Sequence, residues 1–273
     1  MVKRISIITI NLNNVKGLRQ TIESVVPQLN DAIEFIIIDG NSTDGSLEVI
    51  KEYESKITLW KSEEKQGIYT DMNKGIASAN GEYCLFLNSG DWLNTNIISE
   101  AIEACTGEGI IYFNNYLSYS NASFEQIIYP PTLTMRSFYK QTIGHQATLI
   151  RRELFYKFGM YNEGNAIYSD YEFWLKSIIM ENATCKHVNK FLSFYDMGGQ
   201  SSKPDENAVK EINSILNRNF PKRVLDDYEY WYNREREMEI LVWYKNQKLL
   251  YRLLVFIYKI TKNLTRLVHG RSK

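Results

Sequence analysis

The sequence predicts an α/β protein whose open, doubly wound and mostly parallel sheet is followed by a helical C-terminal extension. Continuous β-branched runs at residues 5–10 and 34–38 are typical of strands buried on both faces of a parallel sheet. Apolar residues at helical spacing lie between these runs. The same alternation of strand and helix continues to residue 87, which is the pattern of a parallel sheet with right-handed crossovers.

The elements of this first half follow one another closely. After the helix that joins the first two strands, Asp44 can cap a second helix, and Ile57–Trp60 forms a short third strand. A third helix stops at Asn80 and Gly81, because glycine favours helix termination, and Tyr83–Leu87 forms the fourth strand.

Beyond Asn94 the periodicity is less regular. It indicates helices near residues 96–105 and 152–158 and at Tyr171–Met180, and strands near residues 109–113 and 146–150. From about residue 205 onward it predicts helix almost throughout. We therefore expect one domain over residues 1–204, with halves at 1–95 and 96–204, and a helical extension over residues 205–273.

Charge and cysteine content exclude several classes of protein. Residues 245–273 hold eight Lys or Arg and no Asp or Glu, which leaves residues 1–244 with 24 basic and 32 acidic side chains. Such an acidic body argues against nucleic-acid binding. The three cysteines, Cys84, Cys105 and Cys185, lack a CxxC pair, so neither a disulfide framework nor a zinc knuckle is predicted. We expect a reducing, cytoplasmic setting, with the apolar start of the chain forming a strand rather than a signal peptide.

Ligands of doubly wound sheets bind in the crevice beyond the carboxyl ends of the strands. The turn after the first strand, NLNNVKG, is neither GxGxxG nor GxxxxGKS/T, so a dinucleotide site and a P-loop are not predicted. A bound diphosphate would instead be held by side chains or by a hard cation such as Mg²⁺ or Mn²⁺. Asp91, at the end of the fourth strand, can supply one carboxylate ligand. The polar strand ends that would form this crevice are Asn11–Asn14, Asp39–Asp44, Ser62–Lys65 and Asn88–Asp91.

Five motifs in order along the chain carry a resemblance. They are TINLNN, IIIDGNSTDGS, SEEKQGIYTDMNKGIASANGEY, FLNSGDW and SDYEFWL. This set resembles family 2 glycosyltransferases with the GT-A fold, a Rossmann-like sheet, over residues 4–200. The combination of GIYTDMNKGI with FLNSGDW is similar to bacterial enzymes of exopolysaccharide, colanic acid type and O-antigen (lipopolysaccharide) assembly. The resemblance implies an inverting transfer of a sugar from a nucleotide diphosphate donor to a hydroxyl of a saccharide acceptor. It makes residues 1–95 the nucleotide-sugar-binding half and residues 96–204 the acceptor half.

The motif match also implies roles for residues on the donor side. Thr9 and Asn11 would border the nucleotide, and Asp39 would hydrogen-bond the base with Glu63 nearby. Asp39 could instead stabilise the turn that follows it. Asp71 is a candidate ligand of the donor sugar or ribose, with a solvated helix face as the alternative.

The sequence departs from the family at its metal motif. Where carboxylates are expected, this chain has Asn88 and Gly90, and Asp91 alone keeps its charge. An amide adds no net charge against a divalent ion, so the affinity for Mn²⁺ or Mg²⁺ should depend more on the donor diphosphate. We expect Asp91 to bind the ion and Asn88 to orient the donor. The alternative is that Asp91 caps a following turn.

Inversion at an anomeric carbon needs a carboxylate that takes the acceptor's proton on the face opposite the leaving group. The resemblance assigns this base to Asp170 at the start of a helix. Ser169 and Glu172 are spaced as a capping box, so a purely structural role for this segment is the alternative. His145 matches a His-Gln pair of the related enzymes and is a candidate for the acceptor or the leaving phosphate, or else a buried structural histidine. Residues 198–202 resemble the segment that folds over bound donor.

The C-terminal basic residues recur with a period of seven. On a helix this spacing forms one basic ribbon next to an apolar stretch at 249–260, which is too short to span a bilayer. We expect an anionic membrane surface as the partner of residues 245–273, at the inner face of the cell membrane and beside a lipid-linked acceptor. The alternative is packing against protein, including a second copy of the chain. The ribbon consists of Lys245, Arg252, Lys259, Arg266 and Lys273.

Two other functions compete with the transferase. A sugar nucleotidyltransferase has a similar sheet but needs a glycine-rich signature after the first strand, which NLNNVKG lacks. A non-catalytic nucleotide-sugar-binding or scaffold protein would explain the reduced metal motif. The presence of Asp91 and Asp170 argues against it.

Overall fold

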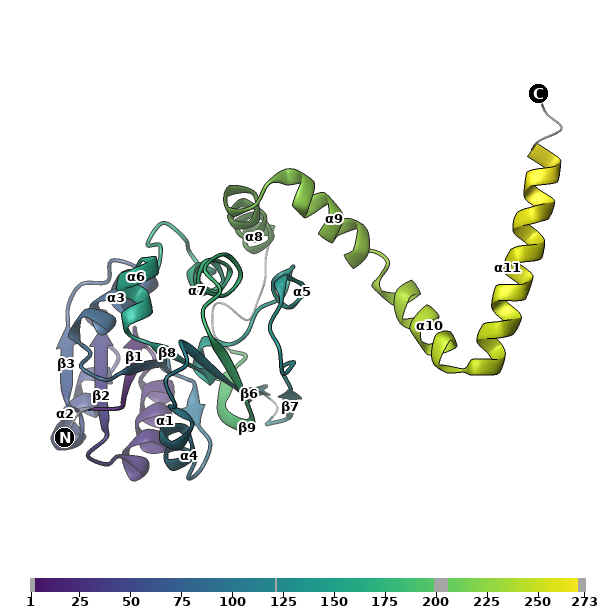
Figure 1. Ribbon diagram of the computed structural model, residues 1–273. Coiled ribbons are helices and arrows are strands. Elements are labelled where there is room, and N and C mark those ends of the chain that lie inside the picture. The colour runs from purple at the N-terminus through teal and green to yellow at the C-terminus, as the bar shows by residue number, and fades with distance from the viewer. Residues whose placement is uncertain (1–2, 121, 199–205, 270–273) are drawn as a thin grey trace. The chain divides into compact units, whose positions relative to one another are not determined.

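The computed structural model describes residues 3–120, 122–198 and 206–269 (Figure 1). The chain divides into two compact units, Met1–Asn219 and Phe220–Lys273. Nine strands in the described residues form a single sheet, all of it in the first unit.

The first half of the sheet is parallel, as the sequence predicts. Its strands are β1 (Ile5–Asn11), β2 (Ile33–Asp39), β3 (Leu59–Ser62) and β4 (Tyr83–Phe86), in the order β3-β2-β1-β4. The register pairs Asn11 with Asp39 and Asp39 with Ser62. The polar ends of three strands therefore lie side by side at one edge, as the crevice requires.

Helices cover both faces of this parallel half (Figure 1). They are α1 (Val15–Val25) with the 3₁₀ turn η1 (Val26–Gln28), α2 (Ser46–Glu52) with η2 (Glu54–Lys56), and α3 (Ile68–Ser78). Since side chains alternate across a strand, Ile5 and Ile7 share one core cluster with Leu18 of α1. Ile8 faces the other way, toward Gly75 of α3, where an added Cβ would lie 2.5 Å from its Cγ2. Glycine therefore lets α3 pack closely on the sheet beside the crevice.

The second half of the sheet is mixed, and it adds antiparallel strands to the predicted parallel ones. Its strands are β5 (Trp92–Leu93), β6 (Ile110–Ser118), β7 (Phe124–Ile127), β8 (Thr148–Arg151) and β9 (Cys185–Asp196). β8 lies between β4 and β6 and is antiparallel to both. β7 pairs antiparallel with β6, and β5 pairs antiparallel with β9. β9 runs parallel to β6. An antiparallel neighbour needs no crossover helix, and the segment before β8 contains only short helical turns. The helical segments here are α4 (Ile98–Ala104), α5 (Met135–Phe138), η3 (His145–Ala147), α6 (Glu153–Phe158), α7 (Ser169–Trp174) and the π-helical η4 (Leu175–Met180).

Two predicted helix caps differ in detail from the structure. Gly45, not Asp44, stands at the N-cap position of α2, but the Asp44 carboxylate accepts from the first amide of α2, Ser46 N–H, at 3.1 Å and from Val15 N–H at the start of α1 at 2.7 Å. Ser169 and Glu172 form no capping box, because the Ser169 hydroxyl donates to the Asn162 carbonyl at 3.0 Å. Glu172 instead pairs with Arg218 of α8 (Glu206–Asn219).

Helix α8 belongs to the first unit, so the boundary lies at Asn219 and Phe220 instead of at residue 204. The second unit consists of α9 (Lys222–Tyr232), α10 (Glu235–Asn246) and α11 (Lys248–His269). Across the described residues, every helix is too short or too polar to cross a membrane. Lys245 is in α10 and the chain breaks from helical geometry at Gln247, so the predicted basic ribbon is interrupted after its first member.

Candidate active site

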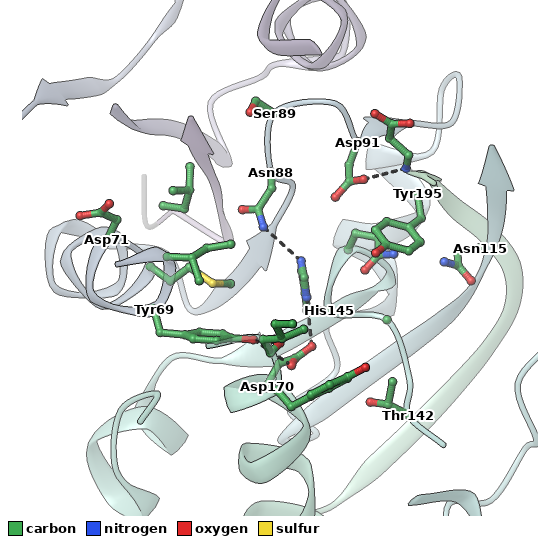
Figure 2. A pocket seen from close by; sticks show the side chains of 18 of the residues that line it. Tyr69, Asp71, Asn88, Ser89, Asp91, Asn115, Thr142, His145, Asp170 and Tyr195 are labelled. Carbon is green, nitrogen blue, oxygen red and sulfur yellow. Dashed lines mark hydrogen bonds and ion pairs between the residues drawn. The ribbon is translucent and has the colours of Figure 1, made fainter. Parts of the chain in front are cut away.

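A cavity of about 730 Å³ opens beyond the carboxyl ends of β1 and β4, between α3 and the start of α7 (Figure 2). It is the crevice that the sequence predicts. The lining includes six of the predicted site residues, which are Asn11, Asp71, Asn88, Asp91, His145 and Asp170.

Three predicted nucleotide residues do not line the cavity. Thr9 is fully buried, and its hydroxyl donates to the Leu87 carbonyl at 2.7 Å. Asp39 is also buried and accepts from Ser42 N–H, Ser62 Oγ and Asn11 Nδ2 at 2.9, 2.7 and 2.8 Å. These bonds match the turn-stabilising alternative for Asp39. Glu63 lies outside, 3.2 Å from Lys74 Nζ.

Asn11 is held by Asp39 and still has an acceptor to offer. Its Nδ2 donates to the Asp39 carboxylate, whereas its buried Oδ1 has no hydrogen-bond partner within the described residues. An unpaired buried oxygen costs free energy unless a ligand satisfies it. Asn11 therefore offers an acceptor to an N–H or O–H group in the cavity.

Asp71 faces the cavity from the first turn of α3 and is 3% exposed, so the alternative of a solvated helix face is wrong. Burial raises its pKa, although Lys74 Nζ at 3.2 Å partly offsets this effect. Lys65 lines the same end of the cavity. A buried carboxyl beside two cations suits hydroxyl groups of a sugar or ribose.

A hydrogen-bonded chain crosses the cavity from Asp170 through His145 to Asn88 (Figure 2). His145 Nδ1 lies 3.1 Å from Asp170 Oδ2, and His145 Nε2 lies 3.4 Å from Asn88 Nδ2. If Nε2 accepts from the Asn88 amide, Nδ1 carries the proton and donates to Asp170. Burial lowers the pKa of His145, but the hydrogen bond and charge of Asp170 outweigh it and raise the pKa above its usual value.

Asp170 itself is fixed by its surroundings. It lies in the first turn of α7, where the helix dipole favours a negative charge. Its Oδ1 accepts from Tyr171 N–H at 2.8 Å and lies 3.3 Å from the Tyr69 hydroxyl. The other oxygen, Oδ2, contacts His145 at the cavity wall. A carboxylate held in this way can take a proton from a bound hydroxyl.

Asp91 lies at the other end of the cavity and is 4% exposed. Burial raises the pKa of its carboxyl to about 7, against the effect of a 2.9 Å hydrogen bond from Asp196 N–H. Gly90 has a φ of +110°, and a Cβ there would lie 3.0 Å from Asp196 Oδ2. The Asp196 carboxylate at the end of β9 thus occupies the space beside Gly90 where the family side chain is missing.

These residues fit a hard divalent cation. The carboxylates of Asp91 and Asp196 both line this end of the cavity. No group of three or more His, Cys, Asp or Glu in the described residues could hold a metal alone. Mg²⁺ and Mn²⁺ commonly use one or two carboxylates and complete their coordination with phosphate oxygens.

The sequence did not single out several lining residues of the second half. Asn115 and Tyr129 contribute to one wall, joined by a 3.2 Å hydrogen bond, and Tyr195 and Asp196 come from β9. In the sequence, Asp196 could have been recognised only as a polar residue two positions before Gly198, at the end of a strand. Of the predicted donor-covering segment 198–202, residues 199–202 lie outside the described part of the chain.

Known proteins resemble the chain in sequence and in fold. The family model described as glycosyl transferase family 2 matches residues 6–168. An uncharacterized glycosyltransferase of Mycobacterium tuberculosis is 32% identical over 211 residues, covering 75% of this chain and 79% of the relative. Staphylococcus aureus TarS 1–349 in complex with UDP-GlcNAc superposes with a TM-score of 0.64 at 18% identity, covering 82% of this chain and 70% of that one. The mannosyltransferase PcManGT from Pyrobaculum calidifontis, in complex with GDP-Man and Mn²⁺, has a TM-score of 0.54 at 14% identity, covering 70% and 56%.

Proposed function

The chain belongs to glycosyltransferase family 2, and from this premise we propose that it transfers a sugar, with inversion, from a nucleotide diphosphate sugar to a saccharide hydroxyl. One observation carries the proposal. Asp170 stands in the cavity wall at the start of α7, and Asn88 and Asp91 stand at the end of β4 (Figure 2). The proposed base and the proposed diphosphate-binding residues thus line one cavity, which supports displacement at an anomeric carbon.

In the proposed reaction, Asp170 takes the proton of the acceptor hydroxyl. The acceptor oxygen forms a bond to the anomeric carbon as the bond from that carbon to the diphosphate oxygen breaks on the opposite face. The electron pair of the broken bond leaves with the nucleoside diphosphate. His145, 3.1 Å from Asp170, holds the carboxylate in position and stabilises its charge before the proton arrives.

At the donor end, Asp91 would hold Mn²⁺ or Mg²⁺ with help from Asp196. The cation, when bound, supplies positive charge that stabilises the departing diphosphate. Asn88, whose Nδ2 faces the His145 ring at 3.4 Å and which lines the cavity, would orient the donor.

We propose that Asn11 meets the nucleotide directly and that Asp39 acts through it. Asp39 accepts from Asn11 Nδ2, which turns the unpartnered Asn11 Oδ1 away from the carboxylate. In this arrangement Thr9 and Glu63 support the site from outside the cavity. Asp71 binds the donor sugar or ribose, for which its burial and its place in the lining are the support.

Exposed apolar side chains in the second unit favour binding of the chain to a membrane, where a lipid-linked acceptor would be found. On α11, Leu249 and Phe256 are 86% and 61% exposed, and residues 245–273 are rich in Lys and Arg. Such a helix suits the interface of an anionic bilayer. We therefore propose a lipid-linked saccharide acceptor in cell-surface polysaccharide synthesis, at the inner face of the cell membrane.

The function is tested with Asp170→Asn in the full chain. The substitution removes the proton acceptor while keeping the size of the side chain, so donor hydrolysis should fall by roughly 10²- to 10⁴-fold with donor binding unchanged. UDP-glucose, UDP-galactose, UDP-N-acetylglucosamine and GDP-mannose, each with and without Mn²⁺, are the probes for hydrolysis and for calorimetric binding. Wild-type protein that binds one of these sugars and never turns it over would favour the non-catalytic binder instead.

A further inference from the structure

A single carboxylate on α8 holds three consecutive backbone amides of the cavity wall. Glu211 Oε2 accepts from Ala166 N–H at 3.0 Å, and Glu211 Oε1 accepts from Ile167 and Tyr168 N–H at 3.0 and 2.7 Å. Ala166, Ile167 and Tyr168 all line the cavity. Successive amides that converge on one anion form a nest, and hydrogen bonds to a charged acceptor are about twice as strong as neutral ones.

This wall segment leads directly into the turn that carries Asp170. The Ile167 carbonyl accepts from the Tyr69 hydroxyl, and the same hydroxyl lies 3.3 Å from Asp170 Oδ1. The Tyr69 hydroxyl therefore contacts both the wall, through the Ile167 carbonyl, and the Asp170 carboxylate. Glu211 is the contact that fixes the outer side of the wall, because it satisfies the amides that no strand pairs.

We propose that Glu211 is a positioning residue for the transfer reaction. It does not touch the substrate; it holds the wall at residues 166–168 and thereby fixes the direction of the Asp170 carboxylate. Helix α8 is then part of the catalytic unit, although it lies beyond the residues matched by the family model. The inference rests on the proposed function for the role of Asp170, but the effect of Glu211 on the wall does not depend on it.

The activity test compares Glu211→Ala and Glu211→Gln with Arg218→Gln in the full chain. Arg218, on the same helix, binds Glu172 and Asn165, neither of which lines the cavity. We expect Glu211→Ala to lower kcat for donor hydrolysis by on the order of 10- to 100-fold without changing donor affinity, because small misplacements of a base are costly. Glu211→Gln keeps one acceptor oxygen, so its kcat should lie between the values of Glu211→Ala and wild type. Arg218→Gln should lower Tm while kcat stays at the wild-type value.

Hydrogen exchange of the backbone amides at residues 166–168 provides a measurement that needs no substrate. These amides should exchange faster in Glu211→Ala than in wild type and should keep their protection in Arg218→Gln. Unchanged protection in Glu211→Ala would overturn the proposal whether or not a donor is found. Equal loss of kcat in Glu211→Ala and Arg218→Gln would also overturn it, since the effect would then follow the docking of α8. A wild-type chain inactive on every donor would count against the transferase assignment, and the exchange result would still decide the role of Glu211 in the wall.

Discussion

Gly90, which follows β4, has no side chain, and the carboxylate of Asp196 at the end of β9 lies in the space beside it. Gly90 adopts a φ of +110°, which favours glycine, and the Asp196 carboxylate approaches to 3.0 Å from the place of its absent Cβ. Asp91, which lies 105 residues before Asp196 in the sequence, accepts a hydrogen bond from the Asp196 amide. One end of the cavity therefore carries two carboxyl groups, one that follows β4 and one that ends β9.

We predict that both carboxylates contribute to cation affinity. With saturating UDP, Asp91→Asn and Asp196→Asn should each weaken Mn²⁺ binding by roughly tenfold or more, because each removes a charged oxygen from a site that has few. The measurement is a Mn²⁺ titration followed by electron paramagnetic resonance, which requires no turnover.

The matched control for this titration is Glu125→Gln. Glu125 is an exposed carboxylate on β7 that hydrogen-bonds to Tyr119 and does not line the cavity. The Glu125→Gln substitution should leave Mn²⁺ affinity unchanged. Wild-type affinity in Asp196→Asn would show that Asp196 only supports the backbone near Gly90.

Single residues at the ends of regular strands could be predicted from the sequence, and their contacts could not. Asp91 and Asp170 follow or begin predictable elements, and the structure places both in the cavity lining. Asp39 also ends a predicted strand, yet four side-chain and backbone donors occupy its carboxylate. Whether a carboxylate faces a ligand or its own turn depends on neighbours from other strands, and a local pattern does not contain them.

At the level of elements, β9 was the main omission of the sequence prediction. Its residues 185–196 mix charged, polar and apolar side chains and are mostly half-buried, so no strict alternation marks a strand. Its pairing with β6 includes register shifts between Phe113 and Asn115, which further disturb the period. The parallel half was predictable because burial on both faces produces unbroken apolar runs. Strands β7 and β9 were not predictable in this way, because most of their side chains are half-buried or exposed.

Glu34 is a buried carboxylate that ties three strands together. It lies in β2 with 2% exposure and accepts from Ser6 Oγ of β1 and from the amides of Asn80 and Gly81, just before β4. Burial raises its pKa, but these hydrogen bonds together outweigh burial and lower the pKa below its usual value. The ionised form is therefore the one that stabilises the folded sheet.

A folded-state pKa below that of the unfolded chain predicts a definite pH dependence. The stabilisation from Glu34 is present above the unfolded pKa of about 4.5 and is lost as pH falls through the folded pKa. We expect Glu34→Gln to be less stable than wild type by about 1–3 kcal/mol near neutral pH, because it misplaces buried donors. The difference should shrink on acidification, as measured by urea unfolding at a series of pH values.

The control for the unfolding series is Glu103→Gln, which changes an exposed glutamate on α4. Its free energy of unfolding should follow that of wild type at every pH. Parallel curves for wild type and Glu34→Gln would mean that the Glu34 carboxylate titrates alike in the folded and unfolded chains, contrary to the prediction.

On the scale of the whole molecule, the second unit differs from the first in where its apolar side chains lie. The first unit buries its large apolar residues around the sheet, whereas α10 and α11 expose many of theirs, including Trp243 at 54% and Leu253 at 55%. Exposed apolar surface of this extent marks an interaction site. Residues 248–273 add seven Lys or Arg and no acid, which favours an anionic surface.

We predict that α11 carries the membrane affinity of the chain. Full-length protein should float with vesicles that contain anionic phosphatidylglycerol, and a chain ending at Gln247, which keeps α10 and removes α11, should not. Because each basic residue near an anionic surface contributes about 1 kcal/mol, Arg252→Gln with Lys259→Gln should weaken flotation by on the order of tenfold or more while keeping the apolar side chains. High salt should have the same effect through screening. Equal flotation of the full and shortened chains would exclude this role, and a mass by light scattering that halves on removal of α11 would assign the helix to a contact between two copies of the chain.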